Sequence, residues 1–342
     1  MKKFEAMKAV YCYLFPETRK IMHEVEKALT DELYFVTTPA KKASENLESL
    51  FEDFAVPETE DGRVNLDEIH APVIERIVDI YSSQLHGLNS FGYSYPTSGS
   101  SEGIFHILTN LKVKGVKQIN VLKGEYEGYK IQAENLEIQV TEIDPDKTEI
   151  NKLEPGYWFI SNPSAKNGNI IPNDFINALC EHGDKVILDF AYVGLTKPHE
   201  FDISNKNIVA AVMSFSKPYG VFRFRIGGFT FSREQMPTLF GNKWFKNVPS
   251  LFQALKLAEE IGPSGLYEKY ATVQKEIIDE LNKDFGIGIK ASDAFLLGYL
   301  TDNDAKSRSN EQLEMIAPFK RGDSYRFCLT PYFERRDAPK SI

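Results

Sequence analysis

Side chains that bind metals or form disulfides are scarce in this sequence of 342 residues. The three cysteines, Cys12, Cys180 and Cys328, are odd in number and far apart, which excludes a disulfide framework and favours the reducing cytoplasm. The six histidines are scattered and lack the spacing of two ligands on one helix. We therefore predict a cytoplasmic protein without a metal site.

A basic excess and long apolar runs are also missing. Lysines and arginines number 40 against 49 aspartates and glutamates, so the net charge of −9 argues against a nucleic-acid partner. No apolar stretch approaches the roughly 18 residues that cross a bilayer. The short apolar run Ala9–Phe15 follows a basic start, but Glu5 interrupts that start and no small-residue cleavage site follows. We expect a soluble protein with no membrane partner.

What is present is an ordinary globular composition, 42% hydrophobic and 26% charged, on a chain long enough for two domains. The first 90 residues have mainly helical patterns. From about residue 95, helical patterns alternate with strand patterns at 118–122, 138–143, 157–161, 185–189, 209–215 and 228–232. This alternation implies crossover connections and a mostly parallel sheet with helices on both faces.

A different pattern follows Pro249, where two helical stretches precede strand patterns at 287–289, 294–300 and 325–329. Helices followed by strands indicate a smaller α+β domain. We therefore predict an α/β fold with three segments. They are an N-terminal segment at 1–60 that belongs to the small domain, a large domain at 61–248, and the rest of the small domain at 249–342.

Two segments have the side chains of a site for an anionic ligand with a carbonyl group. In Thr97–Gly103, hydroxyl residues surround a glycine just before a helix, where unpaired N–H groups bind anions, although serine also caps ordinary helices. Lys217 ends a hydrophobic strand in Ser-Phe-Ser-Lys, and a lysine that can lose its proton forms Schiff bases with carbonyl cofactors. Arg225, eight residues later, could clamp a phosphate. The alternative for Lys217 is a surface lysine in a loop.

Three more residues lie at strand ends or turns. Asp189 follows the run 185–188, at the end of a parallel strand where such sheets bind ligands, and could pair with a protonated ring nitrogen. Asn162 begins an Asn-Pro stretch closed by Gly168, which could be an ordinary turn. Tyr126 either stacks on a flat ring of the ligand or is an ordinary tyrosine, one of sixteen in the chain.

Together these segments resemble the class I and II aminotransferases, which use pyridoxal 5′-phosphate (PLP) and have the aspartate-aminotransferase-like fold. Within this family, the motifs are most similar to those of the histidinol-phosphate aminotransferase branch. The resemblance covers about residues 95–228 and Arg326. It rests on the phosphate loop 99–103, the aromatic at 126, Asn-Pro-x-x-x-x-Gly at 162–168, Asp-x-Ala-Tyr at 189–192 and Ser-x-Ser-Lys at 214–217. No single motif is specific for this family, but the order and spacing of the motifs together are.

The resemblance implies that the large domain binds PLP and assigns roles to its residues. Lys217 forms the aldimine and moves the proton, Asp189 keeps the ring nitrogen protonated, and Tyr192 supports this chemistry at the ring's phenolic oxygen. The other cofactor-binding residues that it implies are Gly99, Ser100, Ser101, Tyr126, Asn162, Ser214, Ser216 and Arg225. A homodimer with sites at its interface is also implied.

Arg326 lies among apolar residues in the strand pattern 325–329. The resemblance implies that it binds the substrate carboxylate, and the alternative is a structural salt bridge to a glutamate. The first 90 residues lack the entry segment that usually shapes the substrate pocket, so the substrate is left open. Arg223 is a rival of Arg225 for the phosphate, but the eight-residue spacing favours Arg225.

The expected function is the transfer of an amino group between an amino acid and a 2-oxo acid in amino-acid metabolism. A PLP-dependent lyase or decarboxylase could use the same residues. A non-catalytic ligand-binding homologue is the second alternative, because fold alone does not settle function. The presence of Lys217, Asp189 and Arg225 together argues against it.

Overall fold

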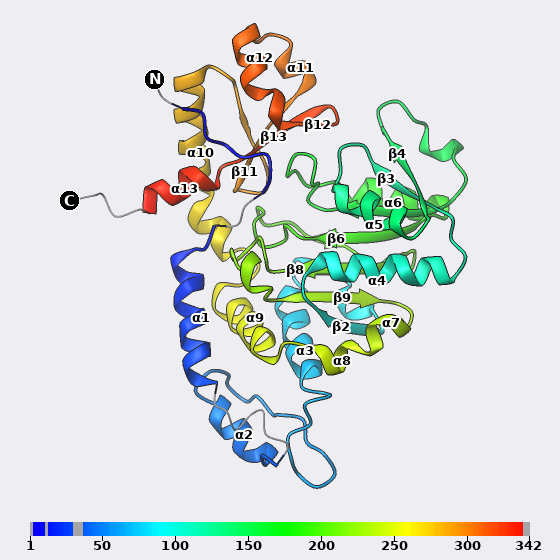
Figure 1. Ribbon diagram of the computed structural model, residues 1–342, viewed down its shortest axis with the longest axis vertical. Coiled ribbons are helices and arrows are strands. Elements are labelled where there is room, and N and C mark those ends of the chain that lie inside the picture. The colour runs from blue at the N-terminus through cyan, green and yellow to red at the C-terminus, as the bar shows by residue number, and fades with distance from the viewer. Residues whose placement is uncertain (1–2, 11–12, 30–36, 338–342) are drawn as a thin grey trace, which may run out of the picture.

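The centre of the molecule is a seven-stranded sheet with the order β2-β9-β8-β6-β5-β3-β4 (Figure 1). The computed structural model describes residues 3–10, 13–29 and 37–337, and Cys12 lies outside them. The strands are β2 (Tyr93–Thr97), β3 (Gln118–Leu122), β4 (Gln139–Ile143), β5 (Tyr157–Ser161), β6 (Lys185–Phe190), β8 (Ile208–Ser214) and β9 (Gly228–Ser232). Only the pairs with β9 are antiparallel. The predicted mostly parallel sheet is confirmed, and β2 was not predicted.

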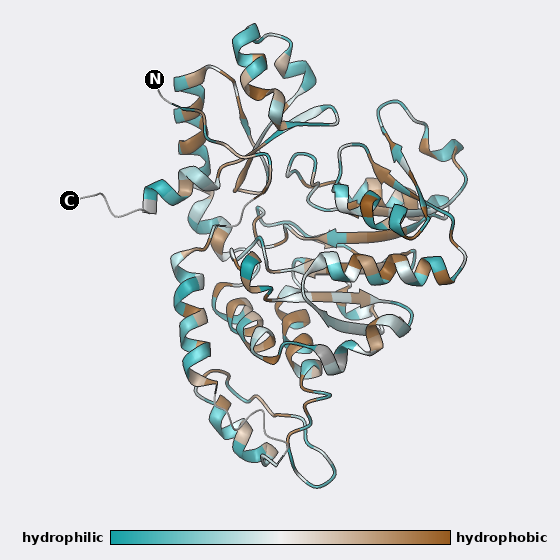
Figure 2. Ribbon diagram, viewed as in Figure 1, coloured by the Kyte–Doolittle hydropathy of each residue, from teal (hydrophilic) through white to brown (hydrophobic). Residues whose placement is uncertain are grey.

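Helices cover both faces of this sheet because its inner strands are apolar on both sides (Figure 2). Ile187 of β6 packs with α4 (Ser100–Val113) and α5 (Glu127–Asn135) on one face. Leu188 points to the other face, which carries α3 (His70–Tyr81), α6 (Asn173–His182) and α9 (Val248–Ile261). Burying each such side chain stabilises the fold by about 1.5–3 kcal/mol.

A second, antiparallel sheet has the order β10-β11-β13-β12. Its strands are β10 (Lys290–Ala291), β11 (Leu297–Thr301), β12 (Lys320–Arg321) and β13 (Ser324–Cys328). The helices around it are α10 (Gly265–Phe285), α11 (Asp302–Ala305), α12 (Asn310–Ile316) and α13 (Thr330–Asp337). The strand predicted at 287–289 is wrong, because Gly286 and Gly288 turn the chain with φ of 64° and 78° and pairing begins only at β10.

The N-terminal segment contacts the second sheet and also a helix that covers the first sheet. Met7 forms a bridge to Cys328 in β13, and α1 (Pro16–Ala28) lies along α9. The α2 helix (Ala40–Leu47) lies at the bottom of Figure 1, far from the second sheet. The short elements are β1 (Leu85–His86), β7 (Phe201–Asp202), α7 (Pro237–Phe240) and α8 (Asn242–Phe245). The domain boundaries at 60 and 248 stay a prediction, and no helix within the described ranges is long and apolar enough to cross a membrane.

Candidate active site

One cavity opens at the edge where β2, β3, β5, β6 and β8 all end. This is the edge at which open parallel sheets bind ligands. The cavity brings together every predicted site residue except Asn162. They are Gly99, Ser100, Ser101, Tyr126, Asp189, Tyr192, Ser214, Ser216, Lys217, Arg225 and Arg326.

The start of α4 forms an anion cradle with the loop after β8. Gly99 has a φ of 118°, and a Cβ there would lie 3.0 Å from the Arg225 guanidinium. The α4 helix begins directly after it, so the unpaired N–H groups of its first turn face this loop. The Ser216 hydroxyl is buried and has no protein partner. An anion with several oxygens would satisfy these donors. Arg223 does not line the cavity, which favours Arg225.

Asp189 lies at the end of β6 and is only 4% exposed. Its Oδ2 accepts a hydrogen bond from the Tyr129 hydroxyl at 3.0 Å, and its Oδ1 accepts one from the Ala191 N–H at 3.0 Å. Burial raises the pKa of Asp189, while the charge of Lys217 and these hydrogen bonds oppose the rise. A cationic ligand group would therefore find a carboxylate already oriented for it. Sequence reasoning missed Tyr129.

Two tyrosines flank the lysine and the cradle. The Lys217 Nζ lies 5.0 Å from the centre of the Tyr192 ring, close enough for a cation–π contact. The Tyr126 hydroxyl lies 3.2 Å from Ser101 Oγ. A Cβ on Gly128 would come within 2.3 Å of the Tyr126 ring, so only glycine allows this ring position. Tyr126 is thus fixed as an aromatic wall of the cavity.

Arg326 is 3% exposed on β13, and none of the described acidic side chains forms an ion pair with it. Its Nη1 donates to the Ala165 carbonyl and lies 3.5 Å from the Tyr192 hydroxyl. Its Nη2 donates to the Lys8 carbonyl at 3.0 Å, and its Nε has no partner. The structural salt bridge considered above is therefore not found. A buried guanidinium with only neutral partners is a strong site for a carboxylate.

Asn162 is the exception among the predicted residues. Its side-chain amide donates to the Ile171 carbonyl at 3.0 Å and accepts from the Ile171 N–H at 2.9 Å. Both ends of the amide are thus used to hold the loop that follows β5. The cavity wall at this point is formed by Ser161 and Ala165 instead. The predicted cofactor contact of Asn162 is corrected accordingly: the residue anchors a loop.

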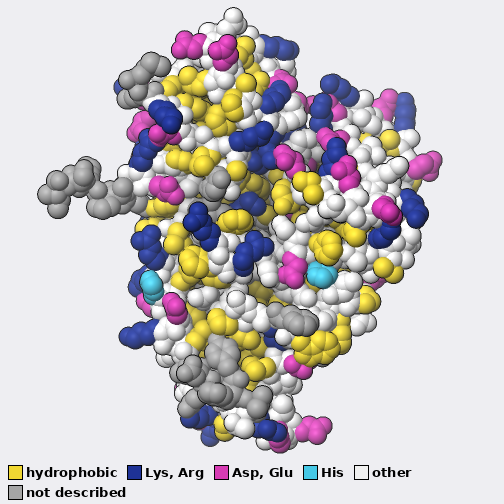
Figure 3. Space-filling view, in the orientation of Figure 1, with side chains coloured by type: hydrophobic (Ala, Val, Ile, Leu, Met, Phe, Trp, Pro, Cys, Tyr) yellow, Lys and Arg dark blue, Asp and Glu magenta, His cyan; other side chains and the backbone are white. Residues whose placement is uncertain are grey.

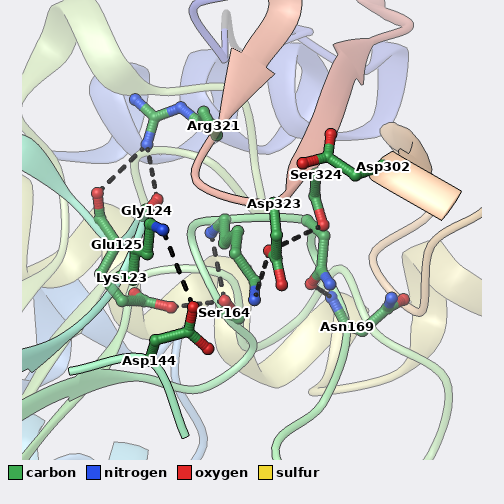
Figure 4. A network of polar contacts seen from close by, with 12 residues as sticks. Lys123, Gly124, Glu125, Asp144, Ser164, Asn169, Asp302, Arg321, Asp323 and Ser324 are labelled. Carbon is green, nitrogen blue, oxygen red and sulfur yellow. Dashed lines mark hydrogen bonds and ion pairs between the residues drawn. The ribbon is translucent and has the colours of Figure 1, made fainter. Parts of the chain in front are cut away.

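Arg321 is the main residue that sequence reasoning missed. It lies on β12 and lines the same cavity as Arg326, with a side chain that is 13% exposed. Figure 4 shows its guanidinium turned toward the backbone of Gly124 and Glu125. Its Nη1 donates to the Glu125 carbonyl at 3.3 Å, and its Nε is buried without a partner. Burial and the charge of Arg326 lower the pKa of Arg321. The sequence does contain a signal for this residue, because Arg321 precedes Arg326 by only five residues and a Gly-Asp turn lies between them.

The lining also explains why the cavity attracts anions. Its cationic side chains are Lys217, Arg225, Arg321 and Arg326. Among the lining residues that the structure describes, only Asp189 has a carboxyl group. A ligand that fills the cavity is therefore expected to carry more than one negative charge.

The sequence of residues 97–262 matches the family model described as aminotransferase class I and II. No curated protein matches the chain. Among solved structures, a PLP-bound putative aminotransferase from Clostridium difficile 630 is 12% identical, with a TM-score of 0.62 over 96% of this chain and 90% of that one.

Two more solved structures align with 96% of this chain, over 96% of the length of their own chains. The histidinol-phosphate aminotransferase from Clostridium acetobutylicum is 16% identical with a TM-score of 0.56. The L-threonine-O-3-phosphate decarboxylase from Porphyromonas gingivalis is 13% identical with a TM-score of 0.58. These likenesses show a shared fold. With the family match, they confirm the resemblance predicted from the motifs.

Proposed function

Because residues 97–262 match the class I and II aminotransferases, we propose that this protein is a PLP-dependent aminotransferase acting on an amino acid and a 2-oxo acid. The observation that carries the proposal is the position of Arg326. Its buried guanidinium has no ion-pair partner among the described residues and lines the same cavity as Lys217 and Asp189. A substrate carboxylate supplies the missing partner.

The residues present fit PLP. The cradle of Gly99, Ser100, Ser216 and Arg225 offers donors to a phosphate, one of them a buried hydroxyl without a protein partner. Asp189 offers a buried, oriented carboxylate to a ring nitrogen. These groups lie at one sheet edge with Lys217, the residue type that binds an aldehyde. The cofactor named by the C. difficile structure is thus compatible with this cavity.

Bound PLP supplies an electron sink for the negative charge that develops when the substrate Cα–H bond breaks. Asp189 holds the proton on the ring nitrogen because its carboxylate pairs with the protonated form. Arg326 binds the substrate carboxylate with two parallel N–H donors and fixes the orientation of Cα. Lys217 accepts the Cα proton at Nζ and returns it later as a general acid. Tyr192, next to both Lys217 and Arg326, keeps the lysine aligned.

A decarboxylase is the second candidate, because the P. gingivalis neighbour is named as one. The two reactions differ in which bond at Cα breaks. Arg326 favours transamination, since a carboxylate held by two N–H donors is retained as an anion. Release of carbon dioxide from an amino acid, with no keto acid formed, would favour the alternative.

The proposal includes a cytoplasmic homodimer. Large apolar side chains are exposed on Phe222, Phe224, Phe240 and Trp244. Phe222 lines the cavity, and Figure 3 shows hydrophobic side chains gathered over α8. Exposed apolar groups of this size are typical of subunit interfaces. Light scattering on the eluting protein should give twice the chain mass of 38.9 kDa, and a monomer would contradict this part of the proposal.

The function is tested by cofactor labelling and a substrate scan. Protein incubated with PLP and reduced with borohydride should carry the cofactor mass on the peptide that contains Lys217. Lys217→Ala should lose the label and all turnover, while Lys206→Ala, at an exposed lysine, should keep both. Amino donors are then screened with 2-oxoglutarate and pyruvate as acceptors. A label on another lysine, or no keto acid from any donor, would contradict the proposal.

A further inference from the structure

The turn that carries Lys217 has one side in the cavity and one side in the core. Ser216 and Lys217 line the cavity. Phe215 and Tyr219, which flank them, are buried in the core behind it. The Tyr219 N–H donates to the Phe215 carbonyl at 3.2 Å, and the Gly220 N–H donates to the Lys217 carbonyl at 3.3 Å. Because the turn is this tight, a force that holds Tyr219 also sets the direction in which Lys217 leaves the backbone.

The core side of this turn contains a pair of buried hydroxyls. The Tyr219 hydroxyl lies 2.7 Å from the hydroxyl of Tyr81, the last residue of α3. It also donates, at the longer distance of 3.3 Å, to the carbonyl of Gly262, which follows α9. A phenol has a single hydrogen, so Tyr81 is the donor in the shorter bond. The turn is therefore tied to the ends of α3 and α9, two helices that lie side by side (Figure 1).

Stability alone does not call for these hydroxyls. The Phe215 ring lies 5.0 Å from the ring of Tyr219 and 5.6 Å from that of Tyr81, so the surroundings are suited to aromatic rings without polar atoms. Replacing both partners of a buried hydrogen bond by apolar groups of the same shape is nearly neutral. A satisfied buried polar pair differs from apolar contacts in that it specifies one arrangement. The pair therefore fixes geometry more than it adds free energy.

Geometry matters for Lys217 because its proposed role is to move a proton. Asp189, on the first sheet, holds the cofactor ring, and Arg326, on the second sheet, holds the substrate carboxylate. Lys217 must reach the Cα atom between these two supports from a turn that belongs to neither strand. A displacement of about 1 Å can slow such a transfer on the order of 100-fold.

We propose that Tyr81 and Tyr219 are positioning residues whose hydrogen bond aligns the Lys217 amine with the substrate Cα. Neither tyrosine lines the cavity, so both act through the turn and not by contact with cofactor or substrate. The inference rests on the proposed function, because this alignment matters when Lys217 moves a proton.

The kinetic test compares Tyr81→Phe, Tyr219→Phe and the double variant with wild type, all loaded with PLP. Tyr219→Phe and the double variant lose both bonds of Tyr219. Their single-turnover rate with an amino acid, followed by the absorbance of bound PLP, should fall by about fivefold, the equivalent of one hydrogen bond. Tyr81→Phe keeps the longer bond to Gly262 and should lose about twofold. KM should stay within about twofold in all three, because Arg326 is unchanged.

Urea denaturation separates positioning from stability, because the two effects follow different orders. Tyr219→Phe leaves the Tyr81 hydroxyl buried without a partner, so it should be the least stable of the three. The double variant has no such hydroxyl and should recover toward wild-type stability, while its rate should remain as low as that of Tyr219→Phe. A double variant that recovers the wild-type rate together with its stability would show that the pair is structural and would overturn the inference.

Hydrogen exchange of the cofactor-free protein gives a readout that needs no turnover. Amides of residues 215–220 should exchange faster in Tyr219→Phe and in the double variant, while those of β5 should keep their wild-type rates. Tyr95→Phe is the matched control, since it removes another buried hydroxyl, one that accepts from the Met236 N–H at 2.9 Å. It should change neither the single-turnover rate nor exchange in the turn.

Unchanged exchange at 215–220 in the double variant, or an equal loss of rate in Tyr95→Phe, would also contradict the inference. Wild type that shows neither bound PLP nor turnover would instead contradict the proposed function. Hydrogen exchange would then still decide whether the hydroxyl pair holds the turn.

Discussion

The two halves of the cavity are built in different ways. The half proposed for the cofactor comes from one sheet, where strand register sets the side chains next to one another. Ser161 pairs with Asp189, and Asp189 with Val212, across three parallel strands. The half proposed for the substrate comes from separate parts of the chain. It combines Arg321 and Arg326 of the second sheet with the backbone of Lys8 near the N-terminus.

This difference extends to the hydrogen bonds. In the cofactor half, Ser216 has a buried hydroxyl without a protein partner, so a phosphate can bind without displacing a protein group. In the substrate half, Arg326 already donates to the carbonyls of Ala165 and Lys8. A substrate carboxylate must therefore exchange with neutral carbonyls, which is favourable because charged acceptors form stronger hydrogen bonds. The cofactor half is preformed, and the substrate half must adjust.

Asp189→Ala should have the largest effect and tests whether the cofactor half has separable parts. The cradle that holds the phosphate does not include Asp189, so PLP should still bind. Turnover should fall by on the order of 100- to 1000-fold, because the ring nitrogen loses its carboxylate partner. The measurements are the PLP dissociation constant and kcat. A variant with near-wild-type kcat would show that Asp189 is only a residue at the end of a strand.

Arg326→Lys tests whether the substrate half orients the reacting bond. Lysine keeps the charge but lacks two parallel donors, so kcat/KM for amino acids should fall by about 100-fold, or about 3 kcal/mol of transition-state binding. The spectrum of bound PLP should not change. Amines without a carboxylate are the control, and their rates should stay near wild type. Unfolding, or an equal loss for amines and amino acids, would make Arg326 a structural residue.

Arg321→Gln sharpens the comparison within the substrate half. Arg321 lines the cavity, its Nε has no partner, and its ion pair with Glu127 is long, at 3.4 Å, to a side chain that is 71% exposed. We therefore expect Arg321 to bind an anionic side chain of the substrate. The variant should lower kcat/KM by about 10-fold for substrates with a side-chain carboxylate or phosphate, since a partly exposed charge pair contributes about 1–2 kcal/mol. Substrates with neutral side chains are the control. An equal effect on both substrate classes would contradict this role.

The same contrast explains what the sequence could predict. The cofactor residues lie in short motifs at strand ends, so local pattern and resemblance located Asp189 and Lys217. Arg321 and the carbonyl of Lys8 reach the cavity only through the packing of distant segments, which no local pattern records. Asn162 was misassigned because an Asn-Pro motif fixes the turn but not the direction of its side chain.

Glu102→Gln should have the smallest effect and tests how firmly the cradle is held. Glu102 bonds the Ser98 N–H, which precedes Gly99, and lies 3.4 Å from the Asn242 amide. The hydrogen bond with His106, followed by those with Ser98 and Asn242, lowers the pKa of Glu102 from 4.5 to about 2 against the opposing effect of burial. The folded pKa lies below the unfolded one, so the carboxylate stabilises the fold above pH 4.5. That stabilisation is lost as the pH falls through 2.

Because the Glu102 side chain is about one third exposed, solvent screening reduces the expected loss at pH 7 to about 1 kcal/mol. Urea denaturation of wild type and Glu102→Gln at pH 7, 4 and 2.5 measures it. The difference should be largest at pH 7 and smaller at pH 4 and pH 2.5, because protons bind the unfolded state more readily as the pH falls from 4.5 toward 2. A difference that is unchanged at pH 2.5 would show that Glu102 acts through its shape. The cradle would then be held by packing, as the substrate half is, and the contrast between the two halves would weaken.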